Sequence, residues 1–134
     1  MNSLLKISIC WALLSSVTAH AQLNVTVALP KVTGSKVVVP LAIKNSFAEK
    51  IESARAVVFL LDEQGKLIGQ DTRWVIGGSE NKPALAAGAT NSFHFVIQSA
   101  KAFNSTNLTT KVSFTRIVLE GGKLADINMD VLIE

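Results

Sequence analysis

Few side chains in this 134-residue sequence have the types and spacing that catalysis or metal binding requires. His94 is the single histidine after residue 21, and histidine can act as a general base or a metal ligand. A base needs a positioned nucleophile and a metal needs further ligands, and the sequence places neither near it. We therefore interpret His94, between Phe93 and Phe95, as a solvent-facing strand residue.

Asp126, Asn128 and Asp130 alternate along the chain, which predicts a polar row on one face of a strand, with about 7 Å between neighbours. Such a row binds calcium only if loops supply more oxygens, because calcium takes six or more. We interpret it as the wet face of an outer strand, where charges also oppose edge-to-edge aggregation.

The segment Asp62–Lys66 (DEQGK) lies between two apolar runs. Its two acidic residues are too few for a calcium loop. A short hairpin turn explains it better, with Gly65 at positive φ and Asp62 bonded to the turn backbone. Glu120–Lys123 (EGGK) is predicted to be the same kind of turn.

No serine triad, pair of catalytic carboxylates, glycine-rich phosphate loop or cofactor motif occurs in the sequence. Its one cysteine, Cys10, lies in a segment that we expect to be removed. The sequence therefore predicts no catalytic residue, no metal site and no cofactor.

The elements that position these side chains are predicted from apolar residues at every second position, the period of half-buried strands. Seven such strands and their turns indicate one all-β domain, an antiparallel β-sandwich of immunoglobulin-like or fibronectin-III-like type. The predicted strands are 23–29, 37–43, 54–61, 67–76, 93–97, 112–119 and 125–133.

Two irregularities are predicted within these strands. Pro40 has no amide donor, so its strand should lie at a sheet edge or bulge there. The inward phase shifts between Phe114 and Ile117, which predicts a β-bulge at Thr115 and Arg116.

Residues 1–21 resemble a secretory signal peptide, with Lys6 before the apolar run 7–14 and Ala19-His20-Ala21 at the end. The run is too short to cross a bilayer as a helix, so we expect no membrane span. Cleavage after Ala21 leaves residues 22–134 as an exported, periplasmic or secreted domain. Acylation at Cys10 is the weaker alternative, because the bulky Ile9 precedes it.

Without Lys6 the chain has 12 basic and 10 acidic residues, scattered without a basic run. Nucleic-acid and anionic-membrane partners usually require a basic stripe, so we predict no nucleic-acid partner.

An apolar group on one face of the third strand predicts a contact surface: Val57, Phe59 and Leu61 alternate with the inward residues of that strand. Trp74 is either a core residue, as in many sandwich folds, or a platform for a sugar or peptide.

The segment from Val39 to Phe95 resembles the FxLYD domain, a bacterial extracytoplasmic β-sandwich module. Val58-Phe59-Leu60-Leu61-Asp62 occupies its motif, after Lys44-Asn45-Ser46 and before Gly65-Lys66-Leu67-Ile68. Val58 and Leu61 depart from the phenylalanine and tyrosine of the motif. The resemblance implies a fold and carries over no catalytic residue.

These observations predict a non-enzymatic module that binds a protein or cell-envelope component through a sheet face or an edge strand. The alternative is a small-ligand or carbohydrate-binding domain that uses Trp74 and Phe59 as exposed aromatic platforms.

Overall fold

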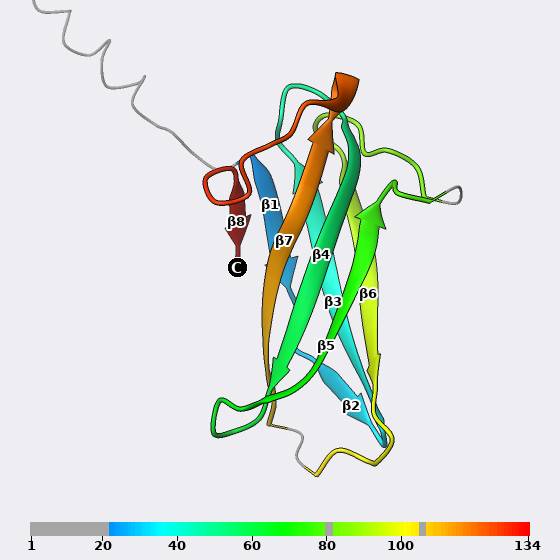
Figure 1. Cartoon of the computed structure of the whole chain (residues 1–134), viewed down its shortest axis with the longest axis vertical. Helices are drawn as coiled ribbons and strands as arrows, with labels where there is room; N and C mark the ends of the chain where they lie inside the picture. Colours follow the sequence, from blue (N-terminus) through cyan, green and yellow to red (C-terminus); the bar gives the residue numbers. More distant parts are fainter. Residues whose placement is uncertain (1–21, 80–81, 105–106) are drawn as a thin grey trace, which may run out of the picture.

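The computed structural model describes residues 22–79, 82–104 and 107–134, which form β-strands joined by turns and one short 3-10 segment (Figure 1). The signal peptide predicted for residues 1–21 lies outside these residues. The elements are β1 (Leu23–Val27), β2 (Lys31–Thr33), β3 (Lys36–Asn45), β4 (Ile51–Leu61), β5 (Leu67–Ile76), β6 (Thr90–Gln98), β7 (Thr109–Leu119), η2 (Glu120–Gly122) and β8 (Val131–Ile133).

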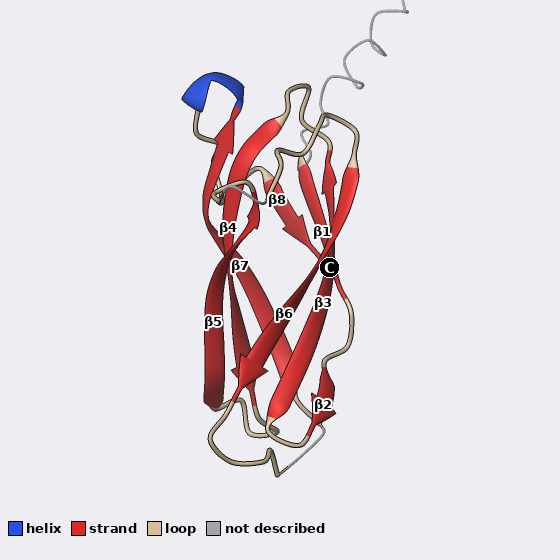
Figure 2. Ribbon diagram, turned by 90° about the vertical axis from the view of Figure 1, so that its right-hand side faces the viewer, coloured by secondary structure: helices blue, strands red, loops and turns tan. Residues whose placement is uncertain are grey.

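The predicted all-β class is confirmed, and the strands lie in two sheets that face each other (Figure 2). In the larger sheet, one side of β3 pairs with β6. The other side of β3 pairs with β2 and then, further along, with β1. The sheet ends with β8, which pairs with β1. In the smaller sheet β4 lies between β5 and β7. The β1–β8 pair is parallel, so the expectation of a wholly antiparallel fold is wrong at this edge.

The core forms because alternate residues of each strand face the opposite sheet. In β4 the inward row is Ala54, Ala56, Val58 and Leu60, and all four are fully buried. The other sheet contributes fully buried or nearly buried residues, among them Leu23, Val25, Val37, Val39, Leu41, Ile43 and Phe95.

The last predicted strand, 125–133, is wrong over most of its length, because only Val131–Ile133 is a strand. Asp126 replaces the strand here with a turn, because it bonds to the backbone of the residues that follow it. Its Oδ1 accepts hydrogen bonds from the N–H groups of Asn128 (2.9 Å) and Met129 (3.3 Å), and its carbonyl accepts one from Asp130 (2.8 Å). Local bonds of this kind compete with strand pairing, so the predicted polar row of Asp126, Asn128 and Asp130 is a turn.

Pro40 lies in β3, which is paired on both sides, so the prediction of an edge strand is wrong. The neighbouring strand is interrupted at this point, however, since β1 ends at Val27 and β2 begins at Lys31. The Pro40 carbonyl accepts a hydrogen bond from Ala28 N–H (3.0 Å) in that gap. Because the N–H and C=O of a strand residue point to the same side, the missing donor faces the interruption.

The DEQGK segment is confirmed as the hairpin turn between β4 and β5. Gly65 has φ +80°, and Asp62 N–H donates to the Lys66 carbonyl at 2.9 Å. Asp62 Oδ1 accepts hydrogen bonds from the backbone N–H of Gln64 (2.9 Å) and of Lys66 (2.8 Å). The carboxylate that a cation would need therefore already holds the turn.

The β-bulge predicted in β7 is also confirmed. Arg55 of β4 is the register partner of Arg116, and Ala56 is the partner of Phe114, which leaves Thr115 as the extra residue. The shift explains why both Phe114 and Ile117 are buried although they are three residues apart.

No helix among the residues that the structure describes is both long and apolar enough to cross a membrane.

Candidate functional site

The predicted contact surface on β4 is exposed only in part. Val57, Phe59 and Leu61 lie on the outer face of the smaller sheet, as the alternation of the strand predicted. Val57, however, is only 7% exposed, so its place in an exposed apolar patch is wrong. It lies in the central strand between its register partners Thr72 and Ser113, and such a residue is shielded from both sides. Phe59 and Leu61 are half-buried.

Trp74 is half-buried, so it is neither a core residue nor an open platform. It is the register partner of Arg55 on β4, and Arg55 Cζ lies 5.8 Å from the centroid of the indole ring. The backbone of Gly78 lies against the same ring, since a Cβ there would come 2.3 Å from Cδ2 and 2.4 Å from Cγ. These two contacts occupy ring surface on which a sugar would have to stack.

Trp74 and Phe59 share a face of the sheet but not a groove. Trp74 pairs with Arg55 and Gln70 pairs with Phe59, so the two rings lie four residues apart along β4, or about 13 Å. Arg73, beside Trp74 in sequence, pairs instead with Asp71, at 2.9 Å between Nε and Oδ2. The paired platform of the carbohydrate-binding alternative is therefore not formed by these aromatics.

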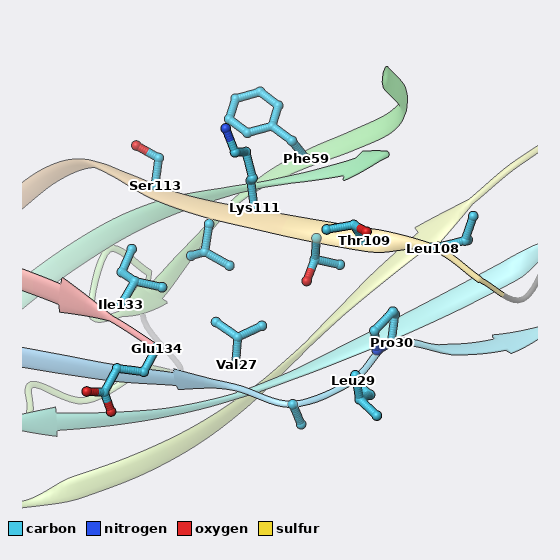
Figure 3. Close-up of a pocket in the computed structure, with 13 residues that line it drawn as sticks. Val27, Leu29, Pro30, Phe59, Leu108, Thr109, Lys111, Ser113, Ile133 and Glu134 are labelled. Atoms are coloured by element: carbon cyan, nitrogen blue, oxygen red, sulfur yellow. The ribbon is translucent and has the colours of Figure 1, made fainter. Parts of the chain in front are cut away.

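A hollow opens along the free edge of β7, and we call it the β7 groove. Its volume is about 740 Å³. In Figure 3, Val27 of β1 and Ile133 of β8 point into the space from one sheet, and β7 borders it from the other. The lining residues are 27–30, Phe59, 108–113, Ile133 and Glu134.

The groove exists because the two sheets are closed on one side and open on the other. On the closed side β5 meets β6, where a Cβ on Gly69 would lie 3.1 Å from Cγ2 of Ile97. On the open side β7 faces the edge formed by β1, β8 and the segment 28–30 (Figures 2 and 3). Core-facing residues such as Val112 and Val27 are consequently only half-buried there.

The chain covers the upper part of this β7 edge with its own backbone. Ala125 N–H donates to the Ile117 carbonyl (3.0 Å), and Leu119 N–H donates to the Lys123 carbonyl (2.7 Å). For Thr109–Ser113, by contrast, the only strand partner among the described residues is β4. Alternate residues of this five-residue stretch therefore direct unpaired N–H and C=O groups toward the groove.

His94 is exposed on β6, and its register partner across the larger sheet is Pro40. In the described parts of the chain no group of three or more His, Cys, Asp or Glu side chains is arranged to hold a metal ion. The absence of catalytic and metal-binding residues stays a prediction, for which Asp126 and His94 provide the test given below.

Only Phe59 of the four predicted surface residues lines the β7 groove. The amino-acid sequence does not indicate the groove, because the groove depends on which strand edges remain unpaired. The weak signal that exists is the alternation of Thr109, Lys111 and Ser113, which identifies the outer face of β7 and says nothing of its partners.

The chain matches no protein-family model, and no curated protein has a significantly similar sequence. Among solved structures, one assigned to the ApaA protein of Bordetella pertussis has a TM-score of 0.57 at 15% identity, over 79% of this chain and 86% of that one. A structural genomics target, SoR45, has a TM-score of 0.47 at 9% identity, over 77% and 75% of the two chains. The first of these similarities concerns the fold alone.

Proposed function

We propose that this domain is a non-enzymatic, exported binding module that holds an extended segment of a protein partner against β7. The observation that carries the proposal is the uncovered stretch Thr109–Ser113 beside an apolar groove. A peptide that adds a strand to a free sheet edge gains affinity from main-chain hydrogen bonds and specificity from pockets for alternate side chains.

The backbone supplies the first half of this recognition. An edge strand of five residues offers two or three outward-directed N–H and C=O pairs, and a peptide strand satisfies them in a regular ladder. The chain itself pairs with the C-terminal end of β7 in this way, where residues 123–125 pair with Ile117 and Leu119. A bound segment would continue that pairing toward the N-terminal end of β7.

The groove supplies the second half. Val27, Val112 and Ile133 are half-buried residues that pack against the core and border the space. Every second side chain of an added strand would point between the two sheets and cover these three residues. We therefore expect the partner segment to carry apolar residues at alternate positions over about five residues.

The contacts of Trp74 favour this proposal over a carbohydrate-binding site built on aromatic platforms. Its ring already contacts Arg55 and Gly78, whereas Phe59 lies four residues away along β4. Stacking a sugar on Trp74 would first require the Arg55 guanidinium to leave the ring.

Two further features belong to the same proposal. The strand order β5-β4-β7, facing β6-β3-β1, is consistent with a sandwich of immunoglobulin-like type. The signal-peptide pattern of residues 1–21 supports export. The resemblance of the segment between Val39 and Phe95 to the FxLYD domain supports both the sandwich type and export.

The test is selection of heptapeptides from a random display library on the immobilised domain, followed by titration calorimetry with the synthetic peptides. We expect the selected peptides to have apolar residues at every second position. Amide hydrogen exchange should slow at alternate residues of Thr109–Ser113 when such a peptide is bound, because the N–H groups that face the groove become paired.

Two controls separate strand addition from other binding. A peptide N-methylated at alternate residues cannot donate to β7 and should lose its affinity. Thr110→Lys places a charge in the groove and should block binding, while Thr26→Lys, the same change on the outer face of β1, should not. Binding that survives both N-methylation and Thr110→Lys would rule out the proposal.

A further inference from the structure

Arg55 and Arg116 are register partners on the neighbouring strands β4 and β7, and both are exposed. Partners in an antiparallel pair have their side chains on the same face, about 5 Å apart at Cβ. Two like charges placed directly opposite each other destabilise a sheet. Among the described residues neither arginine has a carboxylate within ion-pair distance, so the repulsion is not offset.

Trp74 fixes one member of this pair. The three residues form one row across the smaller sheet, in the order Trp74, Arg55, Arg116. The Arg55 guanidinium lies over the indole, which restricts its motion and keeps its donors close to the sheet surface.

Two acidic side chains of the smaller sheet are engaged by other groups. Asp71 of β5 is the register partner of the inward-facing Val58 and pairs with Arg73. Glu52, at the start of β4, accepts a hydrogen bond from the Gly121 N–H at 3.2 Å.

A third cation extends the same face. Lys111 of β7 is the register partner of Phe59, four residues along β4 from Arg55. The side chains of Lys111 and Phe59 lie next to each other in Figure 3. This lysine therefore lies about 13 Å from the arginine pair along the strands.

Lysines on the other sheet show no comparable arrangement. Lys36 has Gln98 and Thr33 as register partners, and Lys44 has Asn24 and Thr90. The like-charge pair is thus a specific feature of the smaller sheet rather than a general property of a slightly basic chain.

We propose that the outer face of the smaller sheet binds an anionic polysaccharide, with one carboxylate of the polymer held between Arg55 and Arg116 and a further one at Lys111. Arginine donates a planar fork of N–H groups that matches a carboxylate. An anion between the two arginines removes their repulsion. The free energy that this repulsion costs the unbound sheet is therefore recovered when the anion binds.

A polysaccharide fits this face better than an acidic protein surface does. Protein interfaces rely on apolar anchors in well-packed pockets. Here the row between the two cationic positions is Thr72, Val57 and Ser113, in which Val57 is buried. The remaining hydroxyl groups are suited to hydrogen bonds with sugars, and the separated cations suit a repeating charge.

The experiment is titration of the domain with polygalacturonate, a carboxylated homopolymer, and with neutral dextran of similar length. We expect binding only to polygalacturonate, with affinity that falls as salt rises. Arg55→Gln and Arg116→Gln should each weaken it about tenfold. Lys44→Gln on the opposite sheet should change it less than twofold, and Thr110→Lys in the β7 groove, which removes no cation from this face, should not weaken it.

Thermal unfolding provides a readout that does not depend on affinity alone. Without polymer, Arg116→Gln should raise the melting temperature, because it removes the repulsion from Arg55. At the same concentration, polygalacturonate should raise the melting temperature of the original protein by more than that of the variant. Equal binding of poly-glutamate of the same length and charge would overturn the polysaccharide assignment. Failure of both polymers to bind, or unchanged binding in Arg55→Gln, would overturn the site.

Discussion

Asn45 and Leu85, forty residues apart in the chain, are joined by a hydrogen bond of 3.0 Å from Asn45 Nδ2 to the Leu85 carbonyl. The same amide donates to the Glu49 carbonyl (3.0 Å), and its Oδ1 accepts from Phe47 N–H (2.9 Å). Asn45 is the one buried polar residue among those described, with 0% exposure. Its side chain therefore ties the β3–β4 turn to the segment that precedes β6.

Replacement of Asn45 by alanine should destabilise the fold by about 2–4 kcal/mol, because it removes three hydrogen bonds and takes from Phe47 N–H and the Glu49 carbonyl the partner they have in the core. Urea unfolding measures the effect. Asn24→Ala removes one exposed bond to Ser46 Oγ and should cost less than about 1 kcal/mol. A smaller loss for Asn45→Ala than for Asn24→Ala would contradict the assigned role.

Substitutions in and next to the turn between β4 and β5 should destabilise the fold in a fixed order. Leu60→Ala should cost about 2–5 kcal/mol because Leu60 is fully buried. Gly65→Val should cost roughly 1 kcal/mol or more, since Gly65 has φ +80°. Glu63→Ala, on the exposed turn, should cost almost nothing. Denaturant melts in which Glu63→Ala equals Leu60→Ala would show that the turn has a role beyond connection.

Gly78 and Gly88 provide a matched pair of substitutions. Their φ values are +78° and +80°, so alanine at either position has a similar backbone cost, about 1 kcal/mol. A Cβ on Gly88 meets open space, whereas one on Gly78 lies 2.3 Å from Trp74 Cδ2. Gly78→Ala should therefore cost about 1–3 kcal/mol more than Gly88→Ala in the same melts. Equal costs would show that the indole moves freely.

Asp126→Ala and His94→Ala should differ in their effect on stability. The Asp126 carboxylate accepts two backbone hydrogen bonds in its turn, so its loss should cost about 1 kcal/mol, more than the loss of a side chain on the wet face of a strand would cost. His94→Ala, on an exposed strand position, should stay within about 0.5 kcal/mol.

Metal binding is tested on the unsubstituted protein. A ligand that binds only the folded state raises the melting temperature. Because we predict no metal site, calcium or zinc should leave the melting temperature of this protein unchanged. A rise of several degrees that either Asp126→Ala or His94→Ala abolishes would establish a metal site.

The sequence predicts strands well where one face is buried, and the inward rows of β3 and β4 follow from alternation alone. β5 was also predicted with its observed bounds, although only Val75 and Ile76 are buried in it. Prediction from sequence fails where local hydrogen bonds favour a turn over a strand, as at Asp126. It also fails where a strand is as short as β2, because three residues give no periodic signal. The β7 groove and the Arg55–Arg116 pair were not predictable, because both depend on strand register and unpaired edges.

The pairing of Leu23 with Val131 joins the first strand of the folded domain to the last. Contacts between residues so distant in sequence require the closure of a long loop, and they slow folding. During synthesis, β1 must wait until nearly the whole domain has left the ribosome before its outer edge finds a partner. The newly made chain would therefore complete its fold late and stay unfolded longest at this edge.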